Sequence, residues 1–114
     1  MAFTEIEFDE IQNEMNTFIT KRGPPENIRD QVDLDYKIDK QSVVLFEKRK
    51  MINQIGMTDV PIAKATFVKT EKKWKIYWQR ADLKWHSYNP KKEVKTIKSF
   101  IAIVDEDKFG CFWG

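Results

Sequence analysis

Hydrophobic and polar residues alternate through the stretch WKIYWQRADLKWHSY, which ends at Tyr88. A period of two is typical of a strand with one buried face. A two-residue turn at 81–82 predicts a hairpin that places Trp78 across from Trp85. The same turn places Tyr77 across from His86, so most of the chain's tryptophans would share one face of this hairpin.

A second hairpin is predicted earlier in the chain. The segments VDLDYKID at 32–39 and VVLFE at 43–47 both alternate, and a short turn between them keeps their apolar residues on one face. Val44 and Phe46 fall on the opposite face. We therefore expect that face to be partly covered as well.

The region between the two hairpins is less regular. Residues 48–61 contain a glycine, a proline and scattered apolar residues, which predicts a long loop anchored on the core. Residues 62–70 predict a third strand. A turn at 71–72 would pair Ala65 with Trp78, a small residue facing a large one.

Apolar residues recur at spacings of three and four in two segments, the period of a helix with one buried face. The first helix is predicted over 4–20, with Thr4 and Glu7 in the pattern of a capping box. The second begins near Thr96 and presents an apolar face over 97–104. The apolar tail 109–114 is predicted to pack on the core.

Together these elements predict an α+β fold in a single domain spanning residues 1–114. It comprises an N-terminal helix and a mainly antiparallel meander sheet of about five strands. A second helix near the C-terminus and a short packed C-terminal strand or tail complete it.

Composition narrows the class of protein. The chain has 114 residues, a net charge of +2 and 41% hydrophobic residues, which predicts a folded domain and not a disordered segment. No apolar run approaches the length needed to span a bilayer, and the acidic N-terminus is unlike a signal peptide. We therefore expect a cytoplasmic protein with no membrane association. Lys and Arg outnumber acids over 64–98, whereas acids dominate the first 39 residues.

A resemblance adds one further expectation. The run YWQRADLKWHSYNP, the strand KATFV at 64–68 and the ending GCFWG resemble a family of small uncharacterised bacterial proteins, described only as a domain of unknown function. The resemblance implies a bacterial origin and a single-domain protein. It implies no activity, cofactor or catalytic residue.

Catalytic and metal chemistry find little support. His86 and Cys111 are the only histidine and cysteine, so a Cys/His metal site and an internal disulfide are not expected. A nucleophile and base pair of Cys111 and His86, oriented by Asp82, would require the tail to fold back onto the hairpin. A lone cysteine among aromatic residues is more typical of a small buried hydrophobe. We predict no catalytic residues, metal or cofactor, and an enzyme ranks third among the hypotheses for this chain.

The predicted sheet suggests where a partner could bind. The face opposite the tryptophans would present aromatic rings among basic residues, the chemistry of platforms that bind single-stranded nucleic acid. The candidate binding residues are Lys64, Lys75, Tyr77, Lys84, His86 and Tyr88. An ordinary solvated strand face would show the same alternation.

Two other kinds of partner fit the sequence. An aromatic-rich sheet face left uncovered by the helices could contact another protein or a second copy of the chain. A small-molecule pocket between a helix and the sheet is equally compatible. The prediction is a non-catalytic binding or assembly domain acting through protein–protein contacts. The alternative is a nucleic-acid-binding protein that uses the Lys/Tyr-rich face.

Overall fold

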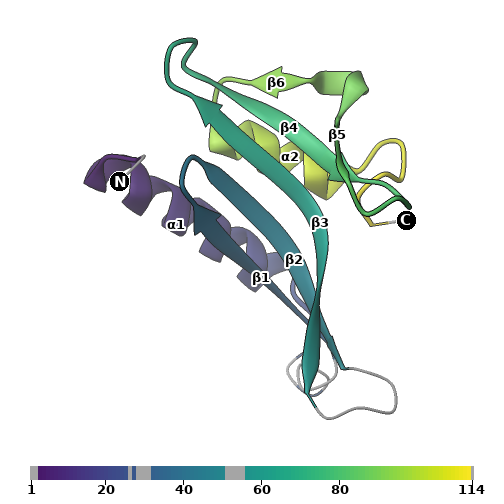
Figure 1. The fold of residues 1–114 in the computed structure, drawn as a ribbon. Helices are drawn as coiled ribbons and strands as arrows, with labels where there is room; N and C mark the ends of the chain where they lie inside the picture. Colours follow the sequence, from purple (N-terminus) through teal and green to yellow (C-terminus); the bar gives the residue numbers. More distant parts are fainter. Residues whose placement is uncertain (1–2, 26, 28–31, 51–55, 114) are drawn as a thin grey trace.

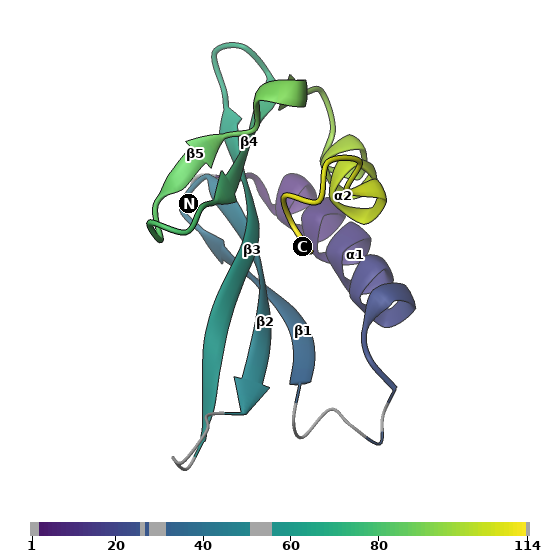
Figure 2. The ribbon, with the colours of Figure 1, turned by 90° about the vertical axis from the view of Figure 1, so that its right-hand side faces the viewer.

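The computed structural model describes residues 3–25, 27, 32–50 and 56–113. The elements in chain order are α1 (Glu5–Arg22), β1 (Val32–Asp39), β2 (Ser42–Lys50), β3 (Met57–Val68), β4 (Lys73–Gln79), β5 (Trp85–Ser87), a 3₁₀ turn at Asn89–Lys91, β6 (Glu93–Val94) and α2 (Ile97–Glu106). Strands β1 to β5 form one antiparallel sheet in sequence order, and β6 pairs with β4. Both helices lie on the same side of the sheet (Figures 1 and 2). The predicted α+β meander is therefore confirmed.

Helix α1 begins as the sequence indicates. The Thr4 hydroxyl accepts a hydrogen bond from the Glu7 backbone N–H at 3.1 Å, and the Thr4 N–H donates to the Glu7 carboxylate at 2.9 Å. This capping box satisfies two backbone donors at the helix start. The buried face of α1 consists of Ile11, Met15 and Phe18, which pack on the sheet core.

The first hairpin, β1–β2, has the predicted faces. Leu45 lies opposite Tyr36, and Val43 lies opposite Ile38, on the side that the helices cover. Val44 and Phe46 alternate onto the other side, yet they are only 8% and 7% exposed. The expectation that both faces of β2 are partly covered is therefore confirmed.

The prediction of a loop over 48–61 is wrong for most of these residues. Strand β2 continues to Lys50 and β3 already begins at Met57, while residues 51–55 lie outside the described part of the chain. The pairing shifts where Leu45 faces Ala63 but Phe46 faces Pro61, so Ile62 is the extra residue of a bulge. The bulge interrupts the alternation, which is why this segment reads as irregular.

The predicted register of β3 with β4 is also wrong. Trp78 pairs with Ala63, and Ala65 pairs with Ile76, because the turn spans residues 69–72 instead of 71–72. Lys72 closes this turn with a φ of 51°. A shift of two residues preserves the faces, so the pairing of Trp78 with a small residue is kept.

Helix α2 and the tail cover the other half of the same face. Thr96 caps α2, and Ile97, Phe100 and Val104 form its buried side, as predicted. After the helix, Asp107 takes a left-handed conformation with a φ of 42°, and its carboxylate accepts the backbone N–H groups of Phe112 and Trp113 at 3.1 and 2.9 Å. Phe112 is buried and Cys111 and Trp113 are half-buried, as expected of a packed tail, but Phe109 is 60% exposed. The tail forms no strand over the described residues up to 113.

Candidate functional site on the uncovered sheet face

The candidate site lies on the sheet face that carries no described helix, turned toward the viewer in Figure 1. Lys64 and Tyr77 are cross-strand partners on this face, and Trp85 lies on the next strand opposite Gln79. The Lys64 ammonium group is 5.2 Å from the ring centroid of Tyr77 and 5.2 Å from that of Trp85. We call these three residues the Lys64 cluster. Each ring face attracts the cation by about 0.5–1 kcal/mol at such partly exposed positions.

Trp85 reaches this face because the β4–β5 loop differs from the predicted one. The Arg80 N–H donates to the Lys84 carbonyl at 3.2 Å and the Leu83 N–H donates to the Arg80 carbonyl at 2.8 Å. Leu83 takes a φ of 62°. This is the geometry of a three-residue hairpin loop at 81–83, a turn followed by a left-handed residue.

The longer loop moves the β5 register by one residue and exchanges its faces. Trp78 pairs with His86, and Tyr77 pairs with Ser87. The predicted pairs Trp78 with Trp85 and Tyr77 with His86 are therefore wrong. The tryptophans do not share one face, because Trp74 and Trp78 belong to the core side while Trp85 lies on the uncovered side.

The six predicted binding residues separate into three groups. Lys64, Lys75 and Tyr77 lie on the uncovered face. Lys84 is exposed at the β4–β5 loop. His86 and Tyr88 fall on the helix-covered side because of the register shift, so the predicted platform of all six residues does not form.

Tyr88 is a core residue. Its side chain is 2% exposed, and its ring centroid is 4.9 Å from that of Phe112 in the C-terminal tail. Burial raises the pKa of the Tyr88 phenol, and the nearby Cys111 and Asp107 add to the shift. Alternation assigns Trp85 to the uncovered face only if the length of the β4–β5 loop is known, and position 83 carries no glycine to signal a left-handed residue.

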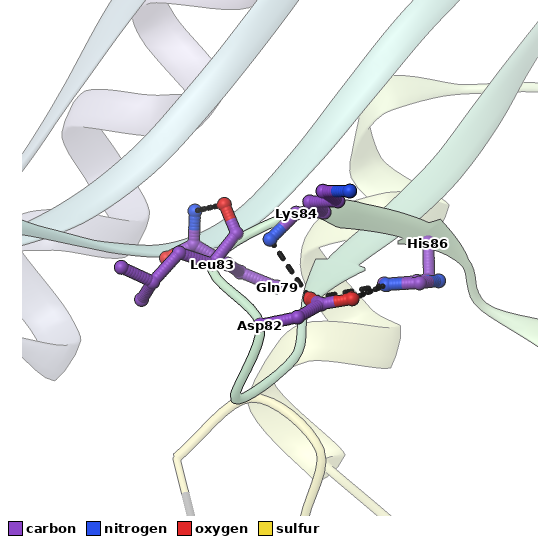
Figure 3. A network of polar contacts seen from close by, with 5 residues as sticks. All are labelled: Gln79, Asp82, Leu83, Lys84 and His86. Carbon is purple, nitrogen blue, oxygen red and sulfur yellow. Dashed lines mark hydrogen bonds and ion pairs between the residues drawn. The ribbon is translucent and has the colours of Figure 1, made fainter.

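His86 holds the β4–β5 loop in place through Asp82, as Figure 3 shows. The His86 Nε2 atom is 2.9 and 3.2 Å from the two Asp82 carboxylate oxygens, and the Lys84 N–H donates to the same carboxylate at 2.9 Å. The Gln79 side-chain amide donates to the Leu83 carbonyl at 3.2 Å. The hydrogen bonds from Lys84 and His86 lower the pKa of Asp82.

The possible catalytic group of Cys111, His86 and Asp82 lacks a cysteine with a lowered pKa. The Asp82–His86 pair forms, but burial raises the pKa of the Cys111 thiol and the Asp107 carboxylate raises it further. A nucleophilic cysteine requires a lowered pKa, because the thiolate is the reactive form. Half-buried Cys111 instead packs against the core, in agreement with its reading as a small hydrophobe.

No group of three or more His, Cys, Asp or Glu side chains is arranged to hold a metal ion within the part of the chain that the structure describes. None of the described helices is long and apolar enough to cross a membrane.

The comparisons identify a family. A family model described as Domain of unknown function (DUF3024) matches residues 3–114. The chain belongs to this family. No curated protein and no solved structure matches it significantly. The DUF3024 match thus covers both helices and every strand, but its description assigns no role to the Lys64 cluster.

Proposed function

We propose that this chain is a non-catalytic binding or assembly domain that contacts a partner protein through the uncovered face of β3, β4 and β5. The observation that carries the proposal is the Lys64 cluster on a face without a helix. Tyrosine and tryptophan are enriched at interface centres, where rigid rings provide contact area at low entropic cost. The uncovered face provides both kinds of ring, because Tyr77 and Trp85 are half-buried there and lie on paired strands.

The charge distribution favours a second copy of the chain as the first partner to test. Asp33, Asp35 and Asp39 alternate onto the β1 side of the uncovered face, while Lys64 and Lys75 lie on the β3 and β4 side. Lys37 and Lys48 share the acidic side, where Lys48 pairs with Asp35 at 3.2 Å, so the acids there outnumber the lysines by one. Among the described residues, neither Lys64 nor Lys75 has a carboxylate within ion-pair distance. A two-fold axis parallel to the strands would place β1 of one copy over β4 of the other, so acids would face lysines.

The experiment measures mass in solution by light scattering over a range of concentrations. We expect a dimer that dissociates as salt increases, since exposed charges are screened within about 8–10 Å. A protein carrying Lys64→Glu and Lys75→Glu should be monomeric, and so should one carrying Asp35→Lys and Asp39→Lys. A mixture of the two should form a heterodimer, because the reversed charges match again. Lys98→Glu on α2 is the matched control and should leave the mass unchanged.

A purely monomeric wild-type protein at high concentration would contradict the second-copy version. A dimer unaffected by either charge reversal would place the interface elsewhere on the molecule. We also propose a cytoplasmic location, which the composition predicts, and a bacterial origin, which the resemblance implies.

Single-stranded nucleic acid is the second candidate partner. Its specific support is the approach of a lysine to two rings, since base stacking on aromatic residues beside cations is the usual mode of such binding. Titration with mixed oligonucleotides should then quench tryptophan fluorescence, weaken steeply with salt and depend on Trp85 and Tyr77. Absence of binding at low salt would remove this candidate. The acids of β1 also limit the basic area to one side of the face.

A further inference from the structure

A cavity of about 460 Å³ lies on the helix-covered side of the sheet, away from the Lys64 cluster. It is bounded by the start of α1, the turn between β3 and β4, and the start of α2, which approach one another at the upper end of the molecule in Figure 1. Its lining combines apolar and charged residues: Phe3, Ile11, Phe67, Trp74 and Ile97 with Glu7, Glu10, Lys69, Lys72 and Lys95. This volume is within the usual range of about 300–1,000 Å³ for small-molecule sites.

Three aromatic rings form one wall of the cavity. The ring centroids of Phe3 and Trp74 are 5.6 Å apart with an interplanar angle of 22°, and those of Phe67 and Trp74 are 5.1 Å apart. Phe3 and Trp74 are only 4% and 6% exposed, so half-buried Phe67 offers most of the ring surface that a ligand could reach. A fixed aromatic wall favours a flat apolar ligand that can stack on it or meet it edge to face.

The charged residues at the rim are mainly cationic and lack partners. Among the described residues, Lys69, Lys72 and Lys95 have no carboxylate within ion-pair distance. Glu7 is occupied, because its carboxylate accepts the Thr4 N–H in the capping box. Glu7 and Glu10 both remain negatively charged, so three lysines and two glutamates give the rim a net charge of +1. Unpaired lysines beside an apolar wall would gain from an anionic group placed between them.

The geometry points to a binding site for a small aromatic carboxylate. The ligand's ring would lie against Phe67 and the exposed edges of Phe3 and Trp74, and its carboxylate would face the ammonium groups of Lys69, Lys72 and Lys95. Helix α2 also begins at this rim and has no acid in its first turn, so its N-terminal end adds positive potential. The lysines and the aromatic wall carry the assignment, and this helix end only strengthens it.

This site is independent of the proposed partner contact. It lies on the opposite side of the sheet and shares no residue with the Lys64 cluster. Failure of one proposal therefore leaves the other intact.

The experiment uses the full-length protein and a matched pair of probes, 1-naphthoate and the neutral 1-naphthamide. Binding is measured by isothermal titration calorimetry, and the site is located by backbone amide NMR shifts near Thr4, Lys72 and Thr96. We expect naphthoate to bind at least about tenfold more tightly than naphthamide, because charge-assisted hydrogen bonds discriminate by about this factor. Lys72→Gln and Lys95→Gln should each weaken naphthoate binding by about fivefold.

Lys21→Gln is the control, since Lys21 is an exposed lysine near the far end of α1 and should leave naphthoate affinity unchanged. All three lysines are exposed, so these variants should fold normally. Four results would overturn the assignment: no naphthoate binding at millimolar concentration, equal affinity for naphthamide, equal weakening by Lys21→Gln, or amide shifts confined to the Lys64 cluster.

Discussion

The two faces of the sheet use their aromatic residues differently. On the helix-covered face, Trp74 and Tyr88 are at most 6% exposed and pack against other rings. On the uncovered face, Tyr77 and Trp85 are only partly buried, and their rings contact the Lys64 ammonium group. Strands β4 and β5 contribute to both faces. The alternation of side chains therefore separates residues that stabilise the fold from residues available to a partner.

The largest expected difference between the faces is in stability. Tyr88→Ala should lower the free energy of unfolding by about 3–4 kcal/mol, because removing a buried ring leaves a cavity in the core. Tyr77→Ala should lower it by less than about 1 kcal/mol, since the ring loses only a partly exposed contact. Urea unfolding of the two variants measures both values. Equal losses would show that the uncovered face contributes to stability as much as the core does.

A smaller effect is expected where the tail closes the covered face. Asp107→Ala removes the acceptor for the Phe112 and Trp113 N–H groups and should cost about 2 kcal/mol. It should also loosen the tail and so expose Tyr88, which packs against Phe112, and Cys111 within the tail itself. The reaction rate of Cys111 with a thiol reagent reports this exposure. Asp105→Ala, which removes only an exposed ion pair with Arg22, is the matched control and should change little.

The sequence predicts the first hairpin better than the second for a physical reason. Strands β1 and β2 are joined by a two-residue turn, and a one-residue slip would move Leu34 and Tyr36 away from the core face. Strand β5 is short, and its register depends on a loop whose left-handed position is occupied by Leu83. A bulky residue seldom takes a positive φ, so nothing in the sequence signals this loop.

The same limit applies to the candidate sites. Lys64, Lys75 and Tyr77 were placed on the correct face because their strands keep their faces when the register moves by two. Trp85 was missed and His86 and Tyr88 were misplaced by the one-residue shift in β5. The cavity near Lys72 joins segments distant in sequence, and alternation assigns faces without giving such contacts.

The loop itself offers a test that should stabilise the protein. Leu83→Gly should raise the free energy of unfolding by about 1 kcal/mol, because glycine adopts the positive φ at this position without steric cost. The uncovered face should keep its geometry, with Trp85 beside Lys64. Tryptophan fluorescence and urea unfolding measure both points. A loss of stability would mean that the Leu83 side chain, 77% exposed, makes a contact worth more than its strain.

The smallest effect concerns pH and the loop network. Because the folded state lowers the pKa of Asp82, the Asp82 carboxylate stabilises the loop at pH values above its ordinary value of 3.8. This contribution should disappear as the pH falls through the lowered folded pKa. In Asp82→Asn the Lys84 N–H keeps an acceptor but the negative charge toward His86 is lost. The wild type should therefore exceed this variant in unfolding midpoint at pH 6, and the difference should shrink toward pH 2. A difference that grows on acidification would show that Asp82 does not hold the loop, and that the placement of Trp85 on the uncovered face depends on strand pairing alone.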